Sequence, residues 1–172
     1  MYRETTATKK IKSMNKRIRA IAGGTSASKT ISILLYLIAK AQSDTHPTLT
    51  SVVSESFPHL RKGAMRDFLS IMQEHEYYND DSWSKTDFTY TFETGSKIEF
   101  FSADQPGKVR GPRRDRLFVN ECNNVHKEAF EQMLVRTKEL CFADWNPVAH
   151  FFMYDEYIDK RDDVEFITLT YK

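Results

Sequence analysis

The sequence predicts an α/β fold in which a mainly parallel central sheet is flanked by helices and includes one β-hairpin. Two observations support this prediction. Short apolar segments alternate with segments of helical periodicity, which is typical of a parallel sheet. The 172 residues also suit a single domain, since a domain usually holds roughly 100–200 residues. We therefore expect residues 1–172 to form one domain.

The first half of the chain is expected to contain two buried strands, each followed by a helix. Residues 18–22 predict the first strand, and residues 28–42 are apolar on every side, which indicates a helix packed against a sheet. Residues 50–54 predict the second strand. Pro58 favours the start of an amphipathic helix, whose apolar positions are Leu60, Ala64, Phe68, Leu69 and Met72.

A hairpin and a loop are expected next. Apolar and polar residues alternate in residues 88–92 and again in residues 98–100, with Thr94 and Gly95 between the two segments. This pattern is typical of two paired strands with one buried face. Residues 103–115 contain two prolines and two glycines, which indicates a loop.

The last third of the chain predicts a strand, a helix and a final strand. Residues 117–119 are a short apolar strand, and Asn123 or Asn124 can cap the helix that follows. Residues 164–170 predict the final strand. The core face of the helix is expected to consist of Ala129, Phe130, Met133 and Leu134.

Charge and composition exclude several classes of protein. Twenty-five basic residues face 24 acidic ones, and the net charge of +1 excludes a uniformly basic nucleic-acid coat. The charges nevertheless form blocks: residues 9–19 and 108–116 are basic, and residues 155–165 are mostly acidic. The longest apolar run, residues 33–39, is far shorter than the ~18 residues of a membrane span. Only two cysteines, Cys122 and Cys141, are present, which indicates a reducing cytosol.

The segment GGTSASKT matches most of the phosphate-binding pattern GxxxxGK[ST], although Ser28 replaces its second glycine. It follows a predicted strand and opens a predicted helix, where backbone N–H groups can hold phosphate oxygens. Lys29 is expected to reach the β and γ phosphates, and the Thr30 hydroxyl to bind Mg²⁺. The alternative is an ordinary turn capped by Ser26 or Ser28. The candidate ATP-binding residues are Gly23, Gly24, Thr25, Ser26, Ala27, Ser28, Lys29 and Thr30.

The segment LFVNE predicts a second part of the same site, because an apolar strand that ends in acidic residues complements a phosphate loop. In the first of these positions Asn120 can contact Mg²⁺ through a bound water, but it supplies no charge. Glu121 is the candidate base that polarises the attacking water. The alternative is a strand end with a solvated glutamate.

Two further segments are candidates for roles near the phosphates. Arg110 lies in the basic block, and an arginine can stabilise the charge of phosphoryl transfer in its own or a neighbouring subunit. The commoner alternative is a solvated basic loop, or contact with DNA phosphates. The segment Asp144-Trp145-Asn146-Pro147 could sense ATP against ADP, or could form an Asx-Pro turn around a packed tryptophan.

Taken in order, these segments resemble the large terminase subunits of tailed double-stranded DNA bacteriophages. The resemblance covers residues 16–172 and rests on GGTSASKT, SKIEFFSADQPGKVRG, LFVNECNNV, DWNPVAHFF and ITLTYK. It implies an ASCE-type P-loop ATPase domain that drives viral DNA into a prohead. It also implies Mg²⁺ as the cofactor of ATP hydrolysis. By motif match, Lys29 and Thr30 correspond to Walker A, and Asn120 with Glu121 to Walker B.

The resemblance also implies further roles and partners. Asp144, Asn146 and Pro147 match the coupling motif, and Arg110 matches an arginine that acts in trans on the ATP of a neighbouring subunit. The implied partners are double-stranded DNA, the portal of the prohead, the small terminase subunit and other copies of the chain in a ring. The implied location is the host cytoplasm, with transient attachment to the prohead and no membrane.

A further expectation concerns nuclease activity. Large terminase subunits normally continue into an RNase H-like nuclease, and this chain reaches Lys172 near the expected end of the ATPase domain. We therefore expect no nuclease domain and no DNA cleavage from these residues. Two alternatives stay open: a nucleotide-binding assembly module with little hydrolysis, favoured by Ser28 and Asn120, and a P-loop helicase or recombination ATPase.

Overall fold

A computed structural model describes residues 5–24, 28–147 and 150–169. These residues form an eight-stranded sheet in the order β3-β4-β5-β2-β6-β7-β1-β8. Neighbouring strands are parallel except at the pairs β3–β4 and β4–β5. The strands are β1 (Ile18–Gly23), β2 (Leu49–Ser54), β3 (Trp83–Ser84), β4 (Thr89–Thr91), β5 (Lys97–Ser102), β6 (Arg114–Val119), β7 (Thr137–Trp145) and β8 (Val164–Leu169). The predicted α/β fold with a mainly parallel sheet is confirmed.

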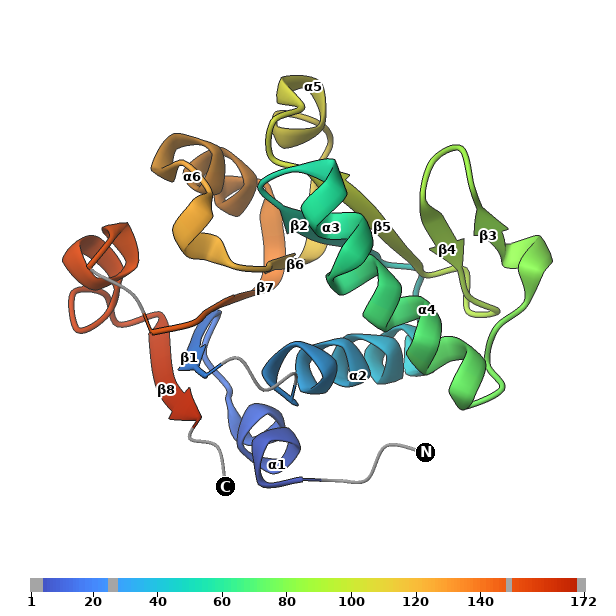
Figure 1. Ribbon diagram of the computed structural model, residues 1–172, viewed down its shortest axis with the longest axis horizontal. Helices are drawn as coiled ribbons and strands as arrows, with labels where there is room; N and C mark the ends of the chain where they lie inside the picture. Colours follow the sequence, from blue (N-terminus) through green and yellow to red (C-terminus); the bar gives the residue numbers. More distant parts are fainter. Residues whose placement is uncertain (1–4, 25–27, 148–149, 170–172) are drawn as a thin grey trace.

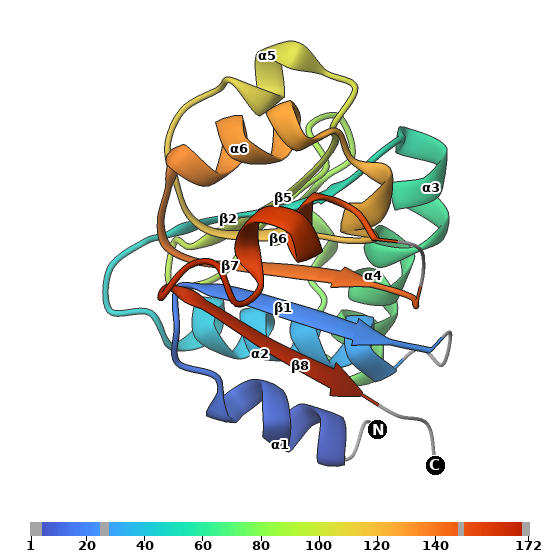
Figure 2. The same cartoon turned by 90° about the vertical axis from the view of Figure 1, so that its left-hand side faces the viewer.

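Helices cover both faces of this sheet (Figures 1 and 2). One face is covered by α1 (Thr6–Ser13), α2 (Ser28–Ser43), α3 (Phe57–Lys62) and α4 (Ala64–Glu74). The other face is covered by α5 (Pro106–Val109), α6 (Lys127–Val135) and the π-helix η3 (Met153–Tyr157). Two short 3₁₀ turns complete the set, η1 (Asp80–Ser82) and η2 (Cys122–Asn124).

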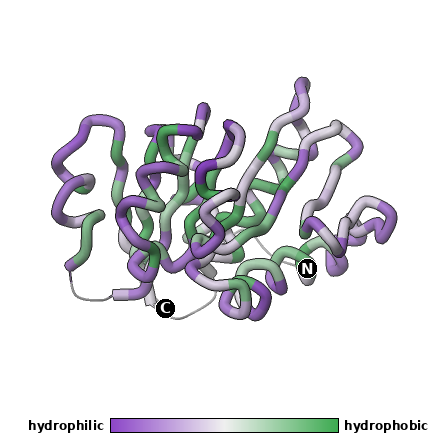
Figure 3. The backbone as a smooth tube through the Cα atoms, turned by 90° about the horizontal axis from the view of Figure 1, so that it is seen from above, coloured by the Kyte–Doolittle hydropathy of each residue, from purple (hydrophilic) through white to green (hydrophobic). Residues whose placement is uncertain are grey.

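Apolar side chains fill the space on both sides of the sheet, and Figure 3 shows hydrophobic residues concentrated along the central strands. Cys122 and Cys141 are both free and buried in the layer beneath α6. None of the helices in the described part of the chain is long and apolar enough to cross a membrane.

The helix predicted from residue 28 is present as α2, but it is less enclosed than the sequence suggested. Leu35 and Tyr36 are only partly buried and Ala39 is exposed. The apolar side chains of α2 are divided between the sheet and two helices, since α1 and α4 both pack against it. Helix α1 was not predicted from the sequence. Thr5 caps it by accepting a hydrogen bond from the Thr8 backbone N–H.

The single helix predicted from Pro58 is wrong, because two helices meet at Gly63. The Gly63 backbone N–H donates to the carbonyls of His59 and Leu60, which ends α3. A Cβ atom at Gly63 would lie 3.0 Å from the His59 carbonyl oxygen, so only glycine allows this close turn without a shift of the chain. Helix α4 then starts at Ala64.

The predicted caps of the helix after residues 117–119 are also wrong. Asn124 lies in the 3₁₀ turn η2, and α6 begins at Lys127 with His126 in the N-cap position. The backbone N–H of Asn124 forms a hydrogen bond within this turn, because it donates to the carbonyl of Glu121. The 3₁₀ turn η2 therefore separates β6 from α6.

The loop predicted over residues 103–115 is shorter than expected, and part of its basic block is buried. Helix α5 forms inside it, and β6 already begins at Arg114. Arg114 is 2% exposed and donates to Ser51 Oγ at 2.8 Å. Arg116 is 3% exposed and its Nη2 lies 2.8 Å from Asp44 Oδ1. These two arginines stabilise the fold and do not contribute to a solvated basic surface.

The ion pair of Arg116 makes a testable contribution to stability. Burial alone would raise the pKa of Asp44, but hydrogen bonds from Arg116, Ser96 and Thr48 lower it to about 2. A carboxyl whose pKa is lower in the folded than in the unfolded state stabilises the fold above its unfolded pKa of about 4. The stabilisation is lost as the pH falls toward the folded pKa.

We expect Asp44→Asn to lower the free energy of unfolding by about 2 kcal/mol at pH 7. The difference from wild type should fall by about half at pH 3, because Asp44 is then protonated in much of the unfolded ensemble. Urea unfolding of both proteins at the two pH values measures this change. Asp162→Asn is the control, since Asp162 is exposed. A difference that stays constant with pH would contradict the assignment.

Candidate active site

The two predicted nucleotide motifs meet where three adjacent parallel strands end. Strand β7 lies between β1 and β6, and all three run in the same direction (Figure 2). The carboxyl end of β1 leads into α2, which carries Lys29 and Thr30, and the carboxyl end of β6 leads into Asn120 and Glu121. Ligands of open α/β sheets bind at this edge. The topology therefore places both motifs at one candidate site.

Lys29 is held at the mouth of this site by the segment after β7. Its ammonium is buried and donates to Asn146 Oδ1 at 2.7 Å and to the Gly24 carbonyl at 3.3 Å. Asn146, which the sequence motif predicts to be a coupling residue, thus contacts Lys29, the predicted Walker A lysine, directly. Ser28 is the first residue of α2. The candidate phosphate-binding residues Thr25, Ser26 and Ala27 lie outside the described residues.

Asp144 joins the two motifs. It is fully buried at the end of β7, where Oδ2 accepts from Thr30 Oγ1 at 3.0 Å and Oδ1 accepts from the Glu121 backbone N–H at 2.8 Å. Burial raises the pKa of Asp144 to about 6, although the positive charge of Lys29 opposes the shift. The sequence motif named Asp144 as a coupling residue but did not show this bridge.

Glu121 has a backbone conformation that few non-glycine residues adopt. Its φ of 52° lies in the left-handed region, which costs an L-residue about 1–2 kcal/mol. The bond from its N–H to Asp144 helps to hold it there. Its carboxylate contacts His59 Nε2, which reaches the site from α3. Sequence reasoning missed His59, because no motif links a residue on α3 to the end of β6.

Asn120 faces a different neighbour from the one expected. Its side chain is buried, and Nδ2 donates to Ser54 Oγ at 3.4 Å, at the end of β2. Its backbone N–H donates to the Val53 carbonyl at 2.8 Å, which continues the pairing of β6 with β2. No hydrogen bond links Asn120 to Thr30 among the described residues.

The remaining predicted residues lie at the margins of the site. Arg110 ends α5 with an exposed side chain, and among the described residues it forms no side-chain hydrogen bond with the other site residues. Pro147 is exposed next to Asn146. Between Asp144 and Asn146, Trp145 is fully buried and donates to Tyr154 Oη at 3.0 Å, which anchors the end of β7.

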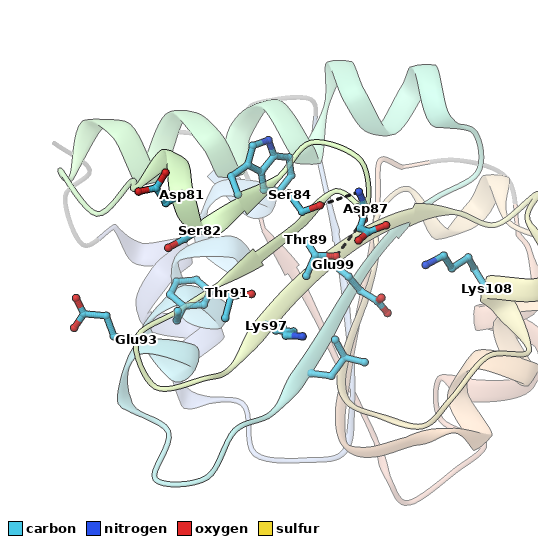
Figure 4. Close-up of a pocket in the computed structure, with 13 residues that line it drawn as sticks. Asp81, Ser82, Ser84, Asp87, Thr89, Thr91, Glu93, Lys97, Glu99 and Lys108 are labelled. Carbon is cyan, nitrogen blue, oxygen red and sulfur yellow. Dashed lines mark hydrogen bonds between the residues drawn. The ribbon is translucent and has the colours of Figure 1, made fainter.

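A separate groove of about 720 Å³ lies over β4 and β5 (Figure 4). Thr89 and Thr91 of β4, Lys97 and Glu99 of β5 and Lys108 of α5 line it. None of the predicted nucleotide-site residues that the structure describes belongs to its lining. The groove is therefore distinct from the candidate active site.

Comparison with known proteins identifies the family. A family model described as phage terminase large subunit matches residues 15–172. The chain belongs to this family. A search of curated protein sequences gave no match. The family match favours a terminase over the helicase or recombination ATPase that the motifs alone left open.

Solved terminase structures share this fold. The large terminase of a thermophilic bacteriophage aligns with a TM-score of 0.81 and 15% identity over 95% of this chain and 45% of that one. The ATPase domain of the Thermus phage P74-26 large terminase aligns with a TM-score of 0.75 and 10% identity over 97% of this chain and 81% of that one. The ASCE-type P-loop fold is thereby confirmed. This terminase chain spans less than half of the first of these two proteins.

The first of these large terminases was also solved in complex with ATP-γ-S, at a TM-score of 0.75 and 17% identity over 91% of this chain and 40% of that one. The N-terminal domain of the DNA packaging ATPase from bacteriophage phi29 aligns with a TM-score of 0.66 and 13% identity over 98% of this chain and 95% of that one. The TM-scores show a shared fold, and at identities this low they show the fold alone.

Proposed function

We propose that residues 1–172 act as one P-loop ATPase domain, which hydrolyses ATP to drive double-stranded DNA into a viral prohead. The observation that supports this most is the convergence of Lys29, Thr30 and Glu121 at one sheet edge in a member of the terminase family. Nucleotide complexes of similar terminases favour the same proposal.

The residues at this edge suit Mg²⁺. Thr30 offers a hydroxyl oxygen and Glu121 a carboxylate, which are the hard oxygen donors that Mg²⁺ prefers, and the buried carboxylate of Asp144 lies next to both. The described residues contain no group of three or more His, Cys, Asp or Glu side chains that could hold a metal by themselves. Mg²⁺ needs no such group, since substrate phosphates and water supply most of its ligands. When bound, it neutralises charge on the phosphates.

The side chains then divide the work of hydrolysis. Lys29 binds the β and γ phosphates, and Glu121 orients a water for in-line attack. Arg110 of a neighbouring copy in a homo-oligomeric ring stabilises the charge that develops on the γ phosphate.

Lys29 also supports a route for coupling. Its ammonium holds Asn146 at 2.7 Å, and phosphate oxygens would compete with Asn146 for the same donors. Nucleotide binding therefore releases the segment Asn146-Pro147, and loss of the γ phosphate restores its contact. This exchange would transmit the state of the nucleotide to the rest of the motor.

Further partners follow from the same proposal. We expect the chain to act in the host cytoplasm, transiently attached to the portal of a prohead and assisted by a small terminase subunit. Its contacts with DNA would be made to phosphates, because a packaging motor must move any sequence. Exposed basic side chains that suit this task include Lys9, Lys10, Lys16, Lys108 and Arg113.

The proposed function is tested first by nucleotide binding. We expect Lys29→Ala to weaken binding of a fluorescent ATP analogue by about 10–100-fold, because hydrogen bonds to a charged group contribute about 1.5–3 kcal/mol. Lys40→Ala, at the other end of α2, is the matched control. Equal binding by wild type and Lys29→Ala would contradict the proposed site.

A second measurement separates the motor from a nucleotide-binding assembly module. Phosphate release is followed for wild-type protein alone and with procapsids and DNA. We expect ATP turnover to rise on assembly. Tight ATP binding without phosphate release under any of these conditions would favour the assembly module instead.

A further inference from the structure

The Walker B strand of this chain lacks the acid that normally supports the metal, and a neighbouring strand supplies one at the same edge. Asn120 takes the expected place of that acid, and its amide is directed to Ser54 on β2. Asp144, on the strand between β1 and β6, accepts the Thr30 hydroxyl proton instead. An amide cannot replace the negative charge of a carboxylate beside a cation.

The geometry at Thr30 suits a metal ligand. A threonine hydroxyl has one hydrogen to donate and two lone pairs to accept with. Because Asp144 Oδ2 accepts that hydrogen at 3.0 Å, the lone pairs of Thr30 Oγ1 stay available for a cation on the nucleotide side. Asp144 therefore sets the orientation of the hydroxyl that is expected to bind Mg²⁺.

The position of Asp144 is firmly determined. Strand β7 pairs with β1 in the register Ile21–Asp144 and with β6 in the register Val119–Ala143. The carboxylate thus lies between the Walker A and Walker B strands. Its second oxygen accepts from the Glu121 N–H at 2.8 Å, so one buried side chain contacts both motifs.

We propose that the Asp144 carboxylate supports the Mg²⁺ site of this ATPase, and that Asn120, at the usual position of the acid, does not. The proposal rests on the proposed function. Asp144 acts as a positioning residue through Thr30 and adds the negative charge that attracts the cation. Asn120 has a structural role, in which it ties the end of β6 to the end of β2.

The test compares nucleotide binding with and without Mg²⁺. A fluorescent, non-hydrolysable ATP analogue is titrated in EDTA and at a series of Mg²⁺ concentrations, with wild type, Asp144→Asn and Asn120→Ala. We expect Asp144→Asn to raise the Mg²⁺ concentration needed for half-maximal binding by about 10–100-fold, the usual effect of losing a residue that orients a metal ligand. In EDTA it should bind the analogue at least as tightly as wild type, because a negative charge near the phosphates is gone.

A purely structural role for Asp144 gives a different result. If Asp144 only held Thr30 and Glu121 in place, Asp144→Asn would weaken binding equally in EDTA and in Mg²⁺, and that result would overturn the proposal. An unchanged Mg²⁺ requirement would overturn it too. Asp44→Asn is the control for lost stability, since it removes a partly buried acid that takes no part in the site.

Asn120→Ala tests the proposal even if Asp144→Asn does not fold. We expect it to keep the wild-type Mg²⁺ requirement, and a tenfold or greater increase would overturn the proposal. The proposed function fails separately, if wild-type protein binds the analogue neither in EDTA nor in Mg²⁺. If wild-type protein binds the analogue but Asp144→Asn does not change the Mg²⁺ requirement, only the proposed role of Asp144 is contradicted, and the proposed function stands.

Discussion

Arg110→Ala is expected to slow ATP hydrolysis by the assembled motor by about 10³–10⁵-fold, the contribution of an arginine that stabilises phosphoryl transfer. The isolated Arg110→Ala chain should hydrolyse ATP at the same rate as the isolated wild-type chain. The reason is the position of Arg110: its side chain is exposed at the end of α5, and among the described residues it has no hydrogen-bond partner at the candidate site. An arginine in this position is free to reach the nucleotide of a neighbour.

Phosphate release measures this effect, for wild type and Arg110→Ala, alone and with procapsids and DNA. Arg113→Ala is the matched control, because Arg113 is exposed in the same segment. Mixing the two proteins adds a second arm: an inactive Arg110→Ala chain mixed with Lys29→Ala should regain turnover where one copy supplies the arginine and the other binds ATP. Wild-type turnover by assembled Arg110→Ala would refute action in trans.

Glu121→Gln is expected to lower ATP turnover by about 10²–10⁴-fold, the usual contribution of a general base, while nucleotide binding is kept. Glutamine has the shape of glutamate but accepts no proton from water. The backbone bond from residue 121 to Asp144 is unaffected by the change, so the left-handed turn should persist. The loss should therefore appear in turnover rather than in affinity.

Single-turnover hydrolysis and binding of a fluorescent ATP analogue separate the two quantities. Glu128→Gln is the matched control, since Glu128 is an exposed carboxylate on α6, close in the sequence. Full turnover by Glu121→Gln would show that another group activates the water. A large loss of affinity would instead indicate that Glu121 holds the site together.

The sequence predicted those elements of the fold whose patterns are local. The strands near residues 18–22, 50–54 and 117–119 and the hairpin around Gly95 are all present. Helix α1 was missed because its apolar residues are few and mixed with lysines, and it is stabilised by packing on α2. The break at Gly63 was missed because apolar spacing continues through it, and the reason for the break is a backbone contact.

In the candidate site too, local sequence patterns predicted some residues, whereas contacts between distant elements were not predicted. The motifs identified Lys29, Thr30 and Glu121, because each belongs to a short segment with a recognisable pattern. His59 could not be found this way, since it reaches Glu121 from another element. The bridge through Asp144 depends on the order of the strands, which the sequence does not reveal.

The basic block at residues 108–116 could not be interpreted from charge alone. Arg114 and Arg116 have the same local sequence context as exposed Arg113, but β6 carries them into the interior. Each finds acceptors in other segments of the chain, buried Ser51 for Arg114 and partly buried Asp44 for Arg116. A surface estimated from sequence would count both arginines as available to DNA, although neither is.

The junction at Gly63 also has a consequence for how long the contact between His59 and Glu121 lasts. Helix α3 has one fully buried apolar side chain, Leu60, whereas α4 has five buried side chains. Segments with few buried contacts open locally at a small free-energy cost while the rest of the domain stays folded. Because the two helices are separate elements, we expect α3 to open locally more readily than α4. The lifetime of the His59 contact, and with it the freedom of the Glu121 carboxylate, is then set by the local stability of six residues rather than by that of the whole domain.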